Sequence, residues 1–133
     1  MKLMKIHLAS VFFILIVASS TGTMSAQTDK FNDIIAALDK GNAAKLSTYF
    51  APTLEIVLLE QSDTYAKQKA SAIIADFFAK NTVTKGFQVV HNGTKDSTSF
   101  IIGNLTTNGG VYRVYVLVRN SETPIIQQLR IEL

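Results

Sequence analysis

The hydrophobic pattern of this chain changes its period at Asn81. Before that residue, most apolar side chains recur every three to four positions, the spacing of one face of an α-helix. After it, apolar and polar residues alternate to the end of the chain, as they do in β-strands. Helices followed by antiparallel strands are expected of an α+β domain whose helices cover one face of a sheet.

Three segments between Thr28 and Lys80 carry the helical pattern. Thr28 is expected to cap a helix from Thr28 to Lys40, and Gly41 to end it in the left-handed conformation. Asn42 is expected to cap a second, shorter helix that stops before Pro52, because proline disfavours helix in the preceding residue. The third helix is expected from about Lys67 to Lys80. The three apolar stripes are, in order, Phe31, Ile34, Ile35 and Leu38; Leu46, Tyr49 and Phe50; and Ala70, Ile73, Ile74, Phe77 and Phe78.

Alternating segments predict the strands. We expect Phe87, Val89 and His91 to share one face of the first strand after Asn81. Thr107-Asn108-Gly109-Gly110 predicts a hairpin turn, because Asn-Gly and Gly-Gly accept positive φ. The other expected strands are Thr53 to Glu60, Ser99 to Thr106, Val111 to Arg119 and Ile125 to Glu132.

The first 26 residues have the organisation of a secretory signal peptide. Two lysines precede an apolar run from Val11 to Ala18, which is too short for the ~20 residues that span a bilayer but suits the core of a signal. Cleavage after Ala26, or alternatively after Ser20, would leave a single domain, which in the first case comprises residues 27–133. We therefore expect an exported protein, periplasmic or secreted, with no stable membrane insertion after cleavage; a retained amino-terminal anchor is the alternative.

Composition argues against several kinds of site. Without Lys2 and Lys5 the 13 basic residues fall to 11, against 10 acidic residues, so residues 27–133 carry a net charge of +1. This near-neutrality argues against nucleic-acid binding. The chain has no Cys, and its only histidine after residue 26 is His91, which is too little for a zinc site. We expect no metal and no cofactor.

Several short segments together resemble one known family. They are Tyr49-Phe50, Phe77-Phe78, His91-Asn92-Gly93, Ile102-Gly103, Tyr112-Arg113-Val114-Tyr115 and Gln128-Leu129-Arg130-Ile131-Glu132. Across residues 27–133 the chain is similar to a family of short secreted bacterial proteins, a domain of unknown function with the nuclear transport factor 2-like (cystatin-like) cone. The resemblance implies an α+β fold in which three amino-terminal helices pack on a curved antiparallel β-sheet. It implies no activity, because folds of this kind carry both enzymes and noncatalytic binding domains.

The acidic residues offer no obvious acid or base inside such a cone. At about 100° per residue, Asp33 and Asp76 project away from the apolar stripes of their helices. The alternative catalytic residue is His91, as a lone base at the mouth of the cone with Tyr49 or Tyr112 as its hydrogen-bond partner. The competing interpretation of His91 is a strand-end histidine bonded to the backbone.

Two candidate binding sites follow. The first is a residual apolar cavity for a small hydrophobic ligand, with Tyr49, Phe78, His91 and Tyr112 as its lining. The second is one face of the central hairpin, which is apolar although a solvated face of an antiparallel sheet should be polar. We expect a homodimer through packed sheets there; the alternative is that curvature or a terminal segment hides the face within one monomer. The residues of this face are Phe100, Ile102, Val111, Arg113, Tyr115 and Leu117.

These observations predict an exported, noncatalytic domain that binds a small apolar ligand or a protein partner. The alternative is a small isomerase-like or dehydratase-like enzyme that uses His91. The outward carboxylates argue against that alternative, and nothing in the sequence identifies a ligand, substrate or biological process.

Overall fold

A computed structural model describes the chain from Ser25 to Leu133, and the side chains from Phe31 onward. The predicted signal segment therefore lies almost entirely outside the described residues and stays a prediction. The helices are α1 (Ser25–Lys40), α2 (Ala43–Ser47) and α3 (Lys67–Lys80). The strands are β1 (Phe50–Leu58), β2 (Gln61–Ala66), β3 (Val83–Lys95), β4 (Thr98–Thr107), β5 (Gly110–Arg119) and β6 (Ile125–Glu132).

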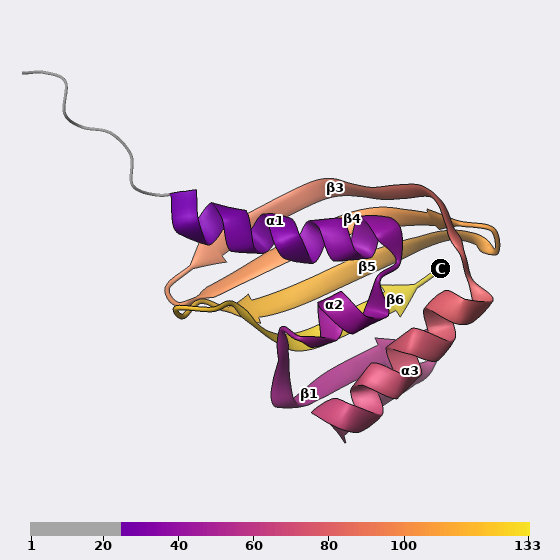
Figure 1. Cartoon of the computed structure of the whole chain (residues 1–133), viewed down its shortest axis with the longest axis horizontal. Helices are drawn as coiled ribbons and strands as arrows, with labels where there is room; N and C mark the ends of the chain where they lie inside the picture. Colours follow the sequence, from indigo (N-terminus) through magenta and orange to yellow (C-terminus); the bar gives the residue numbers. More distant parts are fainter. Residues whose placement is uncertain (1–24) are drawn as a thin grey trace, which may run out of the picture.

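All six strands of the described chain form one sheet, in the order β2-β1-β6-β5-β4-β3. The strands from β3 to β6 form an antiparallel meander, and β1 joins β6 in parallel. Figure 1 shows α1 lying over the β3 and β4 side of the sheet and α3 beside β1, with α2 between the two helices. The predicted α+β fold, with three helices on a curved sheet, is confirmed.

The helices cover the face of the sheet that we call the inner face. On the central hairpin this face consists of Ile101, Gly103, Leu105, Tyr112, Val114 and Val116, and all six are buried. Ile34, Leu38, Ile74 and Phe77 meet them from α1 and α3 within one continuous core. The helices therefore cover the hairpin face opposite to the one that carries the predicted interface residues. The opposite face of the sheet is the outer face.

The first two helices differ from prediction at their ends. α1 begins at Ser25, so Thr28 lies inside it rather than at its cap. Asn42 does cap α2, accepting a hydrogen bond from the backbone N–H of Lys45 at 3.0 Å. α2 ends at Ser47, earlier than predicted. Phe50, which we expected on this helix, instead belongs to β1 and pairs with Ile126 of β6.

The edge strand β2 was not predicted from the sequence. Its residues are exposed except for half-buried Tyr65, so it has no alternation of apolar and polar side chains to reveal it. It forms by backbone pairing with β1 at the edge of the sheet. Asp63 lies within this strand and accepts a hydrogen bond from the backbone N–H of Thr64 at 2.7 Å.

The predicted hairpin is present. Thr107 pairs with Gly110, so Asn108 and Gly109 form the two-residue turn. Positive φ falls at Gly110, at 131°, immediately after the turn. Thr82 and Asn108 tie this turn to the end of α3 through two hydrogen bonds, of 2.8 Å and 3.0 Å.

Candidate functional site on the outer face of the sheet

Four apolar side chains form a compact square at the centre of the outer face. Ile102 of β4 lies opposite Tyr115 of β5, and Phe100 lies opposite Leu117 one step along the same strands. We call these four residues the outer patch. All of them are half-buried, although no helix of the described chain covers this face. Large apolar side chains left partly exposed on a sheet are typical of an association surface.

Aromatic rings extend the outer patch toward the edge strand β3. The ring of His91 lies 5.2 Å from the ring of Phe100, and the ring of Phe100 lies 6.3 Å from that of Tyr115, with only 12° between their planes. Three rings from three neighbouring strands thus form a ladder across the outer face. Phe100 reaches β3 because Gly93 opposite it has no side chain.

The prediction that His91 shares a face with Phe87 and Val89 is wrong. Val89 pairs with Gly103 of β4, but His91 pairs with Ile102, so two residues of β3 correspond to one of β4. This β-bulge inserts one extra residue, so the side chains that follow it in β3 alternate in the opposite sense and His91 changes face. Phe87 stays buried on the inner face, and His91 is exposed on the outer face.

The structure does not bring the four predicted pocket residues together. Tyr112 and Phe78 are both buried and both contact the ring of Phe77, at 5.1 Å and 5.5 Å between ring centres. The hydroxyl of Tyr112 donates to Asn81 Oδ1 at 3.1 Å. His91 is separated from them because it faces the other side of the sheet, and the hydroxyl of Tyr49 is bonded to Asp33 of α1.

The hydroxyl of Tyr49 donates a hydrogen bond to Asp33 Oδ2 at 3.2 Å. Burial raises the pKa of Tyr49 above its ordinary value of 10.0, and the negative charge and hydrogen bond of Asp33 raise it further. Asp33 itself is exposed on α1. The pair therefore links α1 to the chain just before β1.

The carboxylates project outward as predicted. Asp33 and Asp76 are exposed, and Asp76 forms an ion pair with Lys80 at 3.1 Å. Among residues 31–133, the buried polar residues are Ser99 and Thr107, and neither is acidic. Within the same residues, no cluster of His, Cys, Asp or Glu has the arrangement of a metal site.

The predicted interface residues Val111 and Arg113 extend the outer face beyond the patch. Val111 is 54% exposed, and the guanidinium Nε of Arg113 donates to Asn104 Oδ1 of β4 at 2.9 Å. All six predicted interface residues therefore lie on one surface. By strand register, Arg119 and Lys95 lie on the same surface at the other end of β5 and β3.

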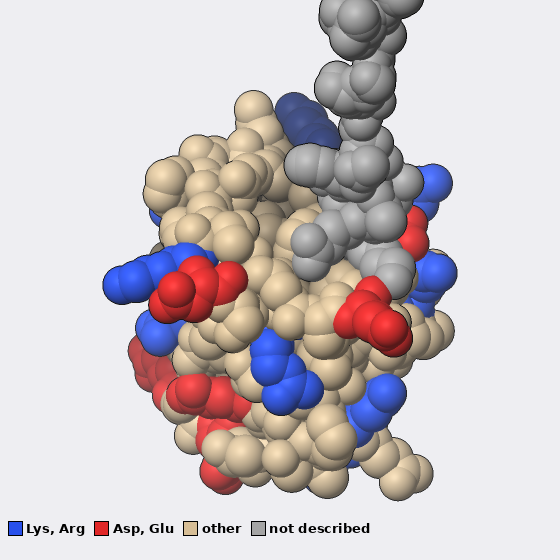
Figure 2. Space-filling model, turned by 90° about the vertical axis from the view of Figure 1, so that its left-hand side faces the viewer, with Lys and Arg blue, Asp and Glu red and all other residues tan. Residues whose placement is uncertain are grey.

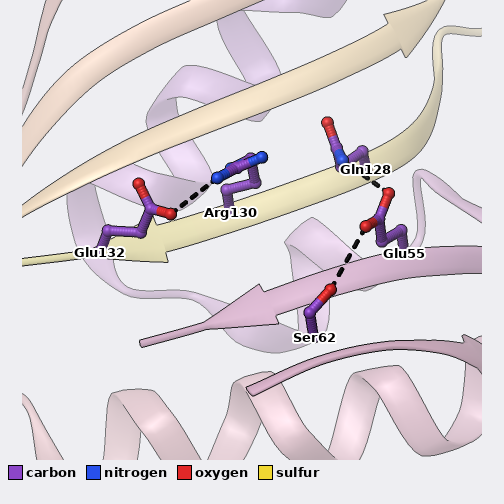
Figure 3. A network of polar contacts seen from close by, with 5 residues as sticks. All are labelled: Glu55, Ser62, Gln128, Arg130 and Glu132. Atoms are coloured by element: carbon purple, nitrogen blue, oxygen red, sulfur yellow. Dashed lines mark hydrogen bonds and ion pairs between the residues drawn. The ribbon is translucent and has the colours of Figure 1, made fainter. Parts of the chain in front are cut away.

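A polar network borders the outer patch on β6 and β1, and it was not predicted from the sequence. Figure 3 shows Glu55 accepting hydrogen bonds from Gln128 Nε2 and Ser62, and Arg130 paired with Glu132. The Gln128–Glu55 bond is 2.6 Å and the Arg130–Glu132 pair 2.8 Å. The sequence pattern carries no signal for the Gln128–Glu55 bond, because it depends on the parallel pairing of β1 with β6, which lie far apart along the chain.

Charges are mixed on the surface drawn in Figure 2, where acidic and basic side chains alternate around uncharged areas. This view shows no continuous field of one sign, as expected from the near-zero net charge. The described part of the chain contains no helix with the length and hydrophobicity needed to cross a bilayer.

Comparisons with known proteins agree with this architecture. A family model described as "Domain of unknown function (DUF4783)" matches residues 31–132. The crystal structure of a DUF4783 family protein from Bacteroides ovatus is 37% identical, with 75% of this chain and 91% of that chain covered and a TM-score of 0.72. A DUF4783 family protein from Bacteroides fragilis is 36% identical, with 75% and 94% covered and a TM-score of 0.70.

A more distant structure shares the fold alone. An NTF2-like protein of unknown function from Cytophaga hutchinsonii is 13% identical, with 84% of this chain and 92% of that chain covered and a TM-score of 0.58. The search of curated proteins gave no match. The chain therefore belongs to the DUF4783 family, a domain of unknown function, and has the nuclear transport factor 2-like fold.

Proposed function

We propose that this domain is a noncatalytic binding module that acts through the outer face of its sheet, and that its partner there is a second copy of the chain. The observation that carries the proposal is the outer patch, in which Phe100, Ile102, Tyr115 and Leu117 stay half-buried on a face that no described helix covers. Packing two such faces together removes these side chains from water, as in a β-sandwich.

The outer face has the dimensions that a stable dimer needs. Without the short edge strand β2, the sheet has five strands. At a spacing of about 4.8 Å and a length of about ten residues each, they give a flat projection on the order of 20 Å by 34 Å. The side chains that stand on the sheet add accessible surface to that projection. Interfaces of ordinary size bury about 800 Å² on each partner. Two copies packed by their sheets therefore come close to that size without help from the helices.

The other hypotheses have less support. A base at the mouth of the cone requires His91 to lie on the same side of the sheet as Tyr112, and it lies on the opposite side. A small-ligand pocket lined by Tyr49, Phe78, His91 and Tyr112 requires the four to meet, and His91 lies on the other face of the sheet from buried Phe78 and Tyr112. The export of the domain stays a prediction from the sequence.

The test is the oligomeric state of the purified protein, measured by sedimentation velocity over a range of concentrations. We expect a dimer, and we expect Leu117→Lys to weaken it at least about tenfold, because burying a leucine contributes roughly 1.5–3 kcal/mol. Leu59→Lys is the matched control, since Leu59 is 43% exposed in the β1–β2 turn, away from the outer patch. A monomer at high concentration, with Leu117→Lys folded and equally soluble, would contradict the proposal.

A further inference from the structure

We propose that His91 makes the association of two copies depend on pH, so that the dimer weakens as the solution becomes acidic. This inference rests on the proposed function, because it concerns the same outer face. Histidine is the side chain whose charge changes between about pH 5 and pH 8. The proposal is that this change occurs inside the contact between the two sheets.

The β-bulge of β3 is what brings His91 to this contact. Without the extra residue, His91 would lie on the inner face with Phe87 and Val89; with it, the imidazole lies on the outer face, 5.2 Å from the ring of Phe100. A second copy that covers Phe100 therefore also takes water from His91. Removal of water disfavours the charged form of a side chain.

The charges around His91 also weaken the contact between two copies in acid. On the outer face, β3 carries Lys95, β4 carries no ionisable side chain, and β5 carries Arg113, Arg119 and the phenol of Tyr115. Beyond them, β6 and β1 carry one cation and two carboxylates, namely Arg130, Glu132 and Glu55. Cations thus outnumber carboxylates, and two identical faces that meet already bring an excess of positive charge together.

The carboxylates are also engaged by other groups. Glu132 is paired with Arg130, and Glu55 accepts hydrogen bonds from Gln128 and Ser62. Among the described residues, a proton on His91 therefore adds a cation to each copy with no uncommitted carboxylate on the outer face to receive it. Dehydration and like charge together favour release of the proton when the dimer forms, so acid favours the monomer.

The small number of histidines makes the effect of His91 simple to isolate. The chain has two histidines, His7 and His91, and only His91 lies in the part that the structure describes. The experiment compares the dimer dissociation constants of the unmodified protein and His91→Gln at about pH 8 and about pH 5.5, by sedimentation velocity at constant ionic strength. Glutamine keeps a polar side chain of similar length but takes up no proton.

We expect the dissociation constant of the unmodified protein to rise about tenfold or more between the two pH values, and that of His91→Gln to stay nearly constant. A dimer whose dissociation constant does not change with pH, or falls in acid, would overturn the role of His91 and leave the proposed function standing. The same rise in both proteins would assign the effect to another group and overturn that role too. A monomer at both pH values would overturn the proposed function itself.

Discussion

The ring of Phe100 lies over Gly93 of the neighbouring strand, where a Cβ atom would stand 2.8 Å from Cε1 and 2.9 Å from Cζ of that ring. The inner face repeats the arrangement, because a Cβ at Gly103 would stand 2.5 Å from Cζ of Phe87. The β3–β4 pair therefore has one phenylalanine lying over a glycine on each face. The inner pair belongs to the core, and the outer pair supports the aromatic ladder.

Gly93→Ala is expected to displace Phe100 and destabilise the domain by roughly 1–3 kcal/mol, the usual effect of forcing a methyl group into occupied space. Chemical denaturation measures the change in unfolding free energy. Phe100→Ala supplies the control, since Gly93→Ala in that background has no ring to displace and should cost much less. Equal costs in the two backgrounds would show that Phe100 is not the obstacle.

A hydrogen bond between α1 and β3 gives the second prediction. The carboxylate of Asp39 accepts from the backbone N–H of Phe87 at 2.8 Å, directly after Gly86, whose φ is +88°. Asp39→Ala leaves that N–H without this partner and is expected to lower stability by about 1–3 kcal/mol. Asp76→Ala is the matched control, because it removes only an exposed ion pair, worth about 0.3–0.5 kcal/mol. Equal losses in the two variants would contradict the role given to Asp39.

The pair of Tyr49 and Asp33 gives a prediction about alkaline pH. Because burial and Asp33 raise the pKa of Tyr49 in the folded state above 10.0, the unfolded chain loses this proton first. The resulting stability is present below about pH 10 and is lost as the pH rises through the folded-state pKa. Absorbance titration of the phenols should show Tyr49 ionising late, above its ordinary pKa of 10.0.

Asp33→Asn separates the causes of that shift. It removes the charge but not the burial, so the pKa of Tyr49 should fall while staying above 10.0. Tyr49→Phe identifies the signal, since the late phenol should disappear from the titration. An unchanged titration in Asp33→Asn would show that the carboxylate does not act on Tyr49.

Much of the fold could be predicted because its signals are local. α3 and β6 begin and end at the predicted residues, since the first has an apolar stripe between charged ends and the second follows a proline-containing turn. The apolar alternation of β4 and β5 likewise identified both faces of the hairpin. In each case the sequence near the element determines its structure.

The errors have a physical cause in pairing between strands. No side-chain pattern in β2 distinguishes a strand from a loop, because its residues are exposed on both faces apart from half-buried Tyr65. The face of His91 depends on one extra residue in β3 relative to β4, and an alternating pattern cannot show where such a residue is inserted. The four pocket residues were grouped on the assumption of unbroken alternation, and the bulge separates His91 from the others.

Tyr112 and Tyr115 lie on opposite faces of β5 and provide the last test, because one ring serves the core and the other the outer patch. Tyr112→Phe removes the hydrogen bond to Asn81 inside the fold and should lower the unfolding free energy by about 1 kcal/mol while leaving dimer formation unchanged. Tyr115→Ala removes a ring that stacks on Phe100, so it should weaken the dimer more than it weakens the fold. Sedimentation velocity and denaturation on both variants separate the two effects, and a dimer that weakens equally in both would mean that the contact does not lie on the outer face.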